Sequence, residues 1–170
     1  MKMHASPRRP ALLTTLALAC LASAPLHAEP FFSSIESRPL SQWWVNPGFY
    51  SAHFQRDKGL NDSNPGLGVE YRMSTVTSLT AGRFYNSDRA YSNYAGVYYQ
   101  PFTIGPFQAG AVVGGFSGYP KMRDGGWFLA AIPVLTLEGE RLGLNIGIVP
   151  TYKDRLYGAI SFQLKLKVWE

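Results

Sequence analysis

The stretch AISFQLKLKVW, residues 159–169, decides the fold class of this chain of 170 residues. Apolar side chains recur there at every second position, at Ile160, Phe162, Leu164, Leu166 and Val168. Such alternation predicts a β-strand with one apolar and one more polar face. A strand of a soluble sandwich shows this pattern. A lipid-facing strand of a transmembrane barrel shows it too, and the terminal Trp169 suits an interfacial position.

The same two-residue period returns in short runs from Phe49 onward, with turn residues between the runs and without a helical period. There are about eight such runs, and they begin near Phe49, Gly66, Thr75, Arg89, Ile104, Trp127, Leu142 and Leu156. Eight strands make the smallest bacterial transmembrane barrels, and closure leaves no strand edge unpaired in lipid. The sequence therefore predicts an all-β fold, an eight-stranded antiparallel transmembrane β-barrel.

The connections between these runs alternate in length. Residues 73–75, 101–106 and 138–141 are compact, whereas 56–64 and 117–125 are longer and charged, as on the outer side of such barrels. The connections after the first, third, fifth and seventh strands share one rim. His53, near the end of the first run, and Asn86-Ser87, after the third, are therefore predicted at the same rim.

Residues 1–28 have the order of a secretory signal peptide. Lys2, Arg8 and Arg9 precede an apolar run, and the small residue Ala28 ends the segment. The run is too short for a membrane-spanning helix, so we expect cleavage after Ala28. In the alternative interpretation, the stretch before Cys20 is a lipoprotein cleavage site, although Ala17 stands where Leu is usual.

Cleavage there changes the available chemistry more than the length. It removes three basic residues and lowers the formal net charge from +5 to +2, so nucleic-acid binding loses its compositional support. The mature chain keeps no Cys and, as its one imidazole, His53. Disulfides, thiol catalysis and Cys/His zinc sites are excluded together, and no cofactor is expected.

Between the signal peptide and the barrel, residues 29–47 are apolar but irregular, with Pro39 interrupting them. We expect a short amphipathic segment at the membrane interface, with a mobile lead-in as the alternative. The barrel is expected to occupy residues 48–170.

Several motifs together resemble the lipid A palmitoyltransferase (PagP) family. They are an aromatic lead-in, Pro-x-x-x-x-x-His ending at His53, Asn-Pro-Gly-Leu-Gly at 64–68, Phe-x-Asn-Ser at 84–87, Tyr-Ala-Gly at 94–96, Ile-Pro-Val-Leu at 132–135 and Ile-Val-Pro-Thr-Tyr at 148–152. No single motif is specific, whereas their order covers nearly all of the mature chain.

The resemblance implies a monomeric enzyme in the outer membrane of a Gram-negative bacterium. Such an acyltransferase moves a palmitoyl or similar chain from a glycerophospholipid donor to the acceptor lipid A. The family's catalytic His, Asp and Ser fall on His53, Asn86 and Ser87. Asn86 departs from the family, because an amide cannot balance an imidazolium charge. It is left as an orienting or oxyanion-stabilising group, and Glu70 or Asp88 remains as a possible carboxylate.

The acyl-chain pocket of the family is a second point of departure. Aligned without gaps, the pocket-floor Gly of the family falls on Tyr98, which predicts a shorter chain or a reshaped pocket; a shift of two residues puts Gly96 there. Proline cannot donate to a strand ladder, so Pro65, Pro133 and Pro150 are expected to open gaps for a lipid tail or to lie at strand ends.

Basic side chains of the long connections are candidates for binding lipid A phosphates, unless they belong to an ordinary solvated rim. They are Arg56, Arg89, Lys121, Arg123, Lys153 and Arg155. Two other functions stay open besides the transferase. One is a noncatalytic small barrel, and the other is an esterase that removes acyl chains from lipid A with the same Ser87 and His53.

Overall fold

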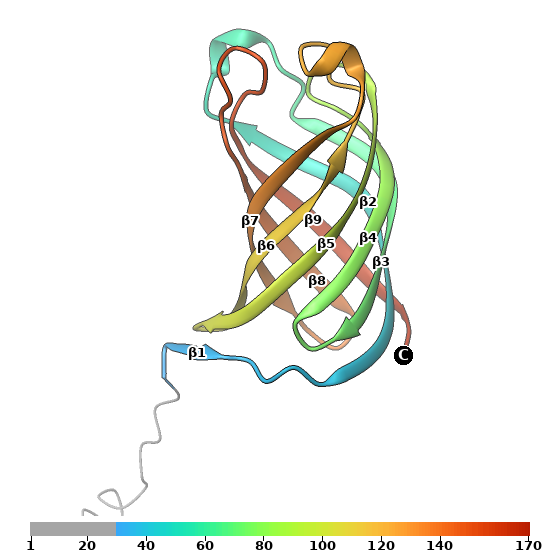
Figure 1. Ribbon diagram of the computed structural model, residues 1–170, viewed down its shortest axis with the longest axis vertical. Coiled ribbons are helices and arrows are strands. Elements are labelled where there is room, and N and C mark those ends of the chain that lie inside the picture. Colours follow the sequence, from blue (N-terminus) through green and yellow to red (C-terminus); the bar gives the residue numbers. More distant parts are fainter. Residues whose placement is uncertain (1–29) are drawn as a thin grey trace, which may run out of the picture.

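The computed structural model describes residues 30–170, so the predicted signal peptide and Cys20 lie outside the described residues. Eight strands form a closed antiparallel barrel, and one short strand lies outside it (Figure 1). The outside strand is β1 (Phe32–Ser34), and the barrel strands are β2 (Pro39–His53), β3 (Ser63–Ser74), β4 (Thr77–Tyr85), β5 (Tyr91–Ile104), β6 (Phe107–Phe116), β7 (Phe128–Glu138), β8 (Leu142–Val149) and β9 (Ala159–Trp169). Each barrel strand pairs with the next, and β9 pairs with β2, so the predicted eight-stranded antiparallel barrel is confirmed.

The barrel begins earlier than the sequence suggested. Strand β2 starts at Pro39 and pairs with β3 from that residue, so residues 39–47 belong to the wall and not to an interfacial segment. Trp44 is only 1% exposed and faces the lumen. The start was missed because proline at 39 and 47 obscures the two-residue period, and the ladder is irregular between Asn46 and Gly48.

The connections alternate as predicted. The lower end carries the tight turns around Thr75, Pro106 and Glu140, and the upper end carries the four longer connections (Figure 1). Two of these contain a short 3-10 turn, at Arg56–Lys58 and Arg123–Gly125. Among the described residues, no helix is both long enough and apolar enough to cross a membrane.

The barrel is apolar outside and polar over much of its inside. On β3, Leu67 is 70% exposed on the outer face. Glu70 and Arg72, at positions of the opposite parity, point inward and are buried in the lumen. On β9, Leu164 is 63% exposed, while Lys165 is 3% exposed. The burial pattern therefore confirms the alternation that the sequence showed, with the apolar face turned outward.

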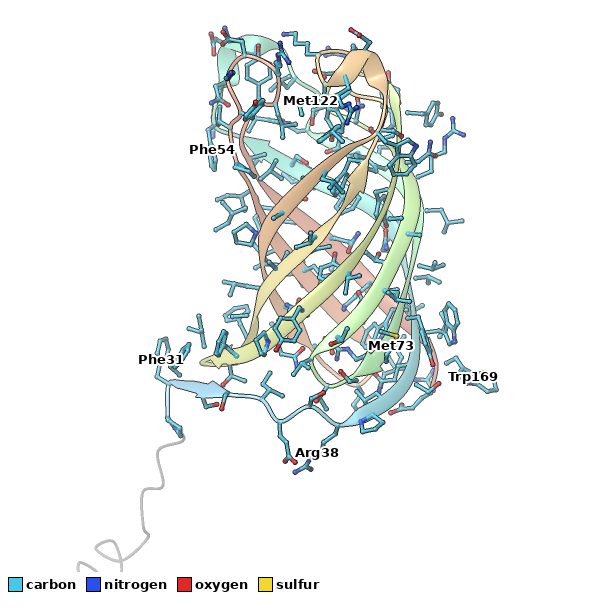
Figure 2. The ribbon with its side chains drawn as sticks, viewed as in Figure 1. Phe31, Arg38, Phe54, Met73, Met122 and Trp169 are labelled. Atoms are coloured by element: carbon cyan, nitrogen blue, oxygen red, sulfur yellow. The ribbon has the colours of Figure 1, made fainter. Side chains whose placement is uncertain are left out.

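Aromatic side chains gather on the outside at both ends. Phe31 and Trp169 project near the lower end and Phe54 near the upper end (Figure 2). Strand β1 is paired with the lower end of β5, and Phe32 stacks on Phe102 with 5.4 Å between the ring centroids.

A network of ion pairs fills the lower lumen. Lys165 on β9 lies 2.9 Å from Glu70 on β3 and 2.7 Å from Glu138 on β7, and Arg72 bonds to the other oxygen of Glu138. Lys165 also lies over the ring of Trp44, 4.9 Å from its centroid. Two cations thus face two carboxylates inside the barrel, and their charges balance.

A ladder of uncharged polar side chains lies above these ion pairs. Gln100 donates to Thr136, whose hydroxyl donates to Asn145, and Asn145 donates to Gln163, with distances of 2.8, 2.8 and 2.9 Å. These bonds satisfy most of the polar atoms of four buried side chains, and they cross-link β5, β7, β8 and β9 through the lumen.

The upper lumen is aromatic and contains a cavity. Phe49, Phe84 and Tyr94 pack edge to face, and Tyr94 stacks on Phe116. The apolar part of the cavity wall comes from β2, β4, β5, β6, β7 and β8, whereas β9 contributes the polar side chains of Ser161 and Gln163. The lumen is therefore divided into a charged lower part and an apolar upper cavity.

The ladder between β7 and β8 covers only their lower parts. It begins at Val134 opposite Gly147, so the upper part of β7, 128–133, has no partner in β8. Pro133 stands at this boundary, whereas Pro150 directly follows the end of β8 and Pro65 is paired with Gly48. Ile132 and Val149, on the two sides of the unpaired part, both line the apolar cavity.

Removal of one cation from the lower network is expected to destabilise the barrel. Lys165→Met leaves Glu70 without its partner in a buried site, so we expect a loss of about 3 to 5 kcal/mol in the free energy of unfolding, measured by urea titration of the protein folded in lipid or detergent.

Lys167→Met is the matched control on the same strand. The Lys167 side chain is 14% exposed and lies over the Trp44 ring, but its partner Glu170 is 68% exposed and stays hydrated without it. Removal of Lys167 should therefore cost about 1 kcal/mol, well below the loss for Lys165→Met. Equal losses for the two variants would contradict a structural role for the buried network.

Candidate active site

Three polar side chains meet at the upper rim. His53 is the last residue of β2, Asp62 ends the connection to β3, and Ser87 lies in the turn after β4. His53 Nε2 lies 2.8 Å from Ser87 Oγ, and His53 Nδ1 lies 2.7 Å from an oxygen of Asp62. The predicted meeting of His53 and Ser87 at one rim is thus confirmed.

These contacts define the proton positions in the neutral imidazole. A carboxylate only accepts hydrogen bonds, so Nδ1 must carry the proton that it donates to Asp62. Nε2 is then an acceptor, and the Ser87 hydroxyl donates to it. The histidine side chain is 5% exposed and that of Asp62 is 50% exposed, so the ring is enclosed while the carboxylate reaches solvent.

Backbone and amide contacts tie the loop of Asp62 to the turn of Ser87. The Asn61 backbone N–H donates to the Ser87 carbonyl over 3.0 Å, and its side chain donates to the Asn86 carbonyl over 3.2 Å. Arg89 donates to the Gly59 carbonyl, also across the two connections. The carboxylate and the hydroxyl are therefore held together independently of His53.

Asn64 extends this support toward β2. Its side-chain amide donates to the Tyr85 carbonyl over 3.0 Å and its oxygen accepts from the Ser51 hydroxyl over 2.7 Å. Asn64 is 1% exposed and Ser51 lies two residues before His53 on the same strand. The three segments that carry the site are thus linked by one buried amide.

Asn86 stabilises the turn and does not contact His53. Its amide nitrogen donates to Ser92 Oγ and to the Gly118 carbonyl, and its oxygen accepts from the backbone N–H groups of Asp88 and Ala90. The residue is 0% exposed. All four hydrogen-bonding positions of the amide are used, two within the turn and two on Ser92 and Gly118, which leaves none for orienting the imidazole.

The two carboxylates considered from the sequence occupy other positions. Glu70 lies in the lower network with Lys165, far along the barrel from the rim. Asp88 lines the crevice beside Ser87, where burial raises the pKa of its carboxyl and the nearby Lys121 and His53 oppose that rise. Among the described residues, Asp62 is the carboxylate that hydrogen-bonds to His53.

Sequence reasoning missed Asp62, although a usable signal existed. The parity argument that brought His53 and Ser87 to one rim also brings the acids of the first connection, Asp57 and Asp62, to that rim. The path of the loop decides between them, because it turns Asp62 toward the ring and leaves Asp57 exposed beside Lys58.

The crevice at Ser87 adjoins the apolar cavity of the barrel. Both spaces are lined by Ser51, Tyr119, Val149 and Leu156. The Ser87 hydroxyl therefore lies beside the cavity. Of the two positions considered for the pocket floor, Tyr98 lines the cavity and packs with Val112 and Val134, whereas Gly96 is not part of its lining.

A hydroxyl, an imidazole and a carboxylate in series can perform nucleophilic acyl chemistry. Within residues 30–170, no group of three or more His, Cys, Asp or Glu side chains is placed to hold a metal ion. No protein-family model matches the chain, and no curated protein matches it.

The role of Asn86 can be tested by introducing the carboxylate that the resembled family has there. In Asn86→Asp, the ionised side chain would face the Gly118 carbonyl without a proton to donate, so we expect a loss of about 2 kcal/mol in unfolding free energy at neutral pH. Protonation of the new carboxyl restores a hydrogen-bond donor, so its pKa should be higher in the folded state than in the unfolded state. The loss of unfolding free energy should therefore shrink as the pH falls toward about 4.

Urea unfolding of both proteins at two pH values measures this difference. If Asn86→Asp were as stable as the unchanged protein at both pH values and more active, position 86 would have a catalytic and not a structural role.

Proposed function

We propose that this protein is an outer-membrane acyltransferase that moves a palmitoyl or similar chain from a glycerophospholipid to lipid A. The observation that carries the proposal is the series Asp62–His53–Ser87 at the mouth of an apolar cavity. The substrate class comes from the resemblance of the ordered motifs to lipid A palmitoyltransferases.

The outer surface supports the membrane location. Large apolar side chains point outward from every barrel strand, including Leu67, Leu79, Val113, Leu129 and Leu142. An exposed apolar surface of this extent is unfavourable in water and favourable against lipid tails. Exposed aromatic residues near both ends, among them Trp127 and Trp169, suit the two interfaces of a bilayer.

The proposed reaction begins with attack of Ser87 Oγ on the donor ester carbonyl. The serine proton moves to His53 Nε2, and Asp62 stabilises the imidazolium that forms. The bond between the carbonyl carbon and the glycerol oxygen breaks, and His53 returns the proton to that oxygen. The products of this half are an acyl ester on Ser87 and a lysophospholipid.

The second half repeats these steps with another hydroxyl. A lipid A hydroxyl gives its proton to His53 Nε2 and attacks the acyl carbon, the bond to Ser87 Oγ breaks, and the proton returns to Ser87. Water in place of the acceptor would make the protein an esterase. The apolar cavity supports transfer because it holds the chain while the lysophospholipid leaves.

Access to the cavity from the side is part of the proposal. The unpaired part of β7 above Pro133 adjoins the cavity, so a lipid tail can pass between β7 and β8 without breaking ladder hydrogen bonds.

Substitution of the three site residues should abolish a lipid change while leaving the barrel folded. Ser87→Ala and His53→Ala are expected to lower the rate at least about a thousandfold. Asp62→Asn should lower it at least about a hundredfold, because an amide favours the wrong imidazole tautomer. Mass spectrometry of lipid A from cells with each variant measures the change.

Asp57→Asn, in the same connection and exposed, is the matched control and should behave as the unchanged protein. A Ser87-dependent gain of one long acyl chain supports the transferase, and a Ser87-dependent loss shows a deacylase instead. An unchanged lipid A with the barrel present in the outer membrane would overturn both and leave a noncatalytic barrel.

Tyr98 is expected to limit the length of the transferred chain. Tyr98→Ala enlarges the cavity, so the transferred chains should shift to longer ones when donors of mixed chain length compete, again measured by mass. Tyr99→Ala, on the same strand but 58% exposed, is the control. An unchanged length distribution in Tyr98→Ala would show that the floor lies elsewhere.

A further inference from the structure

The crevice constrains the part of the lipid that remains outside the cavity. If the acyl chain occupies the apolar cavity and its ester carbonyl lies at Ser87, the rest of the lipid must lie on the outer side of Ser87, under the upper connections. In a glycerophospholipid the phosphate is carried on the same glycerol as the ester. Side chains that line the crevice around Ser87 are therefore within reach of that phosphate.

Two hydrogen-bond donors of the connection between β8 and β9 line this crevice. Arg155 and Tyr157 lie in its wall together with Ser87. Lys121, from the connection between β6 and β7, donates to the Tyr157 hydroxyl over 3.1 Å and lies over the Tyr157 ring, 5.0 Å from its centroid. Because an ammonium group only donates, the Tyr157 oxygen accepts this bond and its own proton remains available to donate elsewhere.

The wall of the crevice contains a guanidinium. Arg155 and Asp88 both line the crevice, and Lys121 lies near Asp88 and Asp154. Among the described residues, neither Arg155 nor Lys121 lies within ion-pair distance of a carboxylate. A guanidinium without a partner binds phosphate through two parallel hydrogen bonds, which a point charge cannot do.

We propose that Arg155 and Tyr157 form a binding site for the phosphate of the acyl donor, with Lys121 holding Tyr157 in place. This inference rests on the proposed function, because Ser87 defines the position of the ester. It distinguishes Arg155 from the other basic side chains of the upper rim. Lys153, two residues before it in the same connection, lies over the Tyr152 ring and is not part of the crevice wall.

The first experiment compares two donors that differ by the phosphoglycerol headgroup. Release of palmitate from dipalmitoylphosphatidylglycerol and from dipalmitoylglycerol is measured in mixed micelles without lipid A. The ratio of the two kcat/KM values is the readout, because a fold defect lowers both rates and leaves the ratio unchanged. We expect the unchanged protein to prefer the phospholipid, and Arg155→Gln to lower the ratio about tenfold.

Lys153→Gln is the matched control and should keep the ratio of the unchanged protein. An unchanged ratio in Arg155→Gln would overturn the proposal, as would equal rates on both donors in the unchanged protein. A defect of Arg155→Gln that appears only in transfer to lipid A would overturn it as well, because the phosphate recognised would then belong to the acceptor.

A binding experiment separates this inference from the proposed catalysis. Ser87→Ala protein is titrated with dihexanoylphosphatidylglycerol and with dihexanoylglycerol, and its intrinsic fluorescence is followed. A preference for the phospholipid that Arg155→Gln removes supports the phosphate site even if the protein shows no turnover. No preference in this experiment overturns the site, whatever the catalytic result.

Discussion

Backbone pairing between β2 and β9 is the constraint on which the rest of the structure depends. It closes the sheet, so that each strand finds two partners and every second connection is brought to the same end. His53 ends β2, Asp62 lies in the connection that follows it and Ser87 lies in the connection after β4. They meet because closure and antiparallel order bring these segments to one rim. The apolar side chains cannot all turn inward in a barrel of this size, and here the outer face takes most of them.

The lumen is divided because polar and apolar groups stabilise the barrel in different ways. In the lower half, charged side chains are buried only as balanced pairs, since a lone buried charge is very unfavourable. In the upper half, aromatic rings leave a cavity that such a network would fill. The proposed acyl chain would extend from Ser87 toward the polar ladder of Asn145 and Gln163.

The site also shows how a carboxylate can be supplied from a different segment. The residue before Ser87 is an asparagine whose amide is fully used in holding the turn, and the carboxylate comes from the connection after β2. Asn61 and Asn64 bind that connection to the turn, so Asp62 keeps its position although half of its side chain is exposed. The carboxylate that hydrogen-bonds to His53 is therefore Asp62, and Asn86 makes no contact with the imidazole.

The sequence by itself determined the strand number, the alternation and the rim shared by His53 and Ser87, because a two-residue period and antiparallel order are local properties. It did not reveal that the wall begins at Pro39, since prolines hide the period there, nor that Asp62 and not Glu70 or Asp88 contacts the imidazole. Those points depend on the path of a loop and on which lumen charges pair across the barrel. Only the tertiary structure decided them, because residues that are distant in sequence come into contact only when the sheet closes.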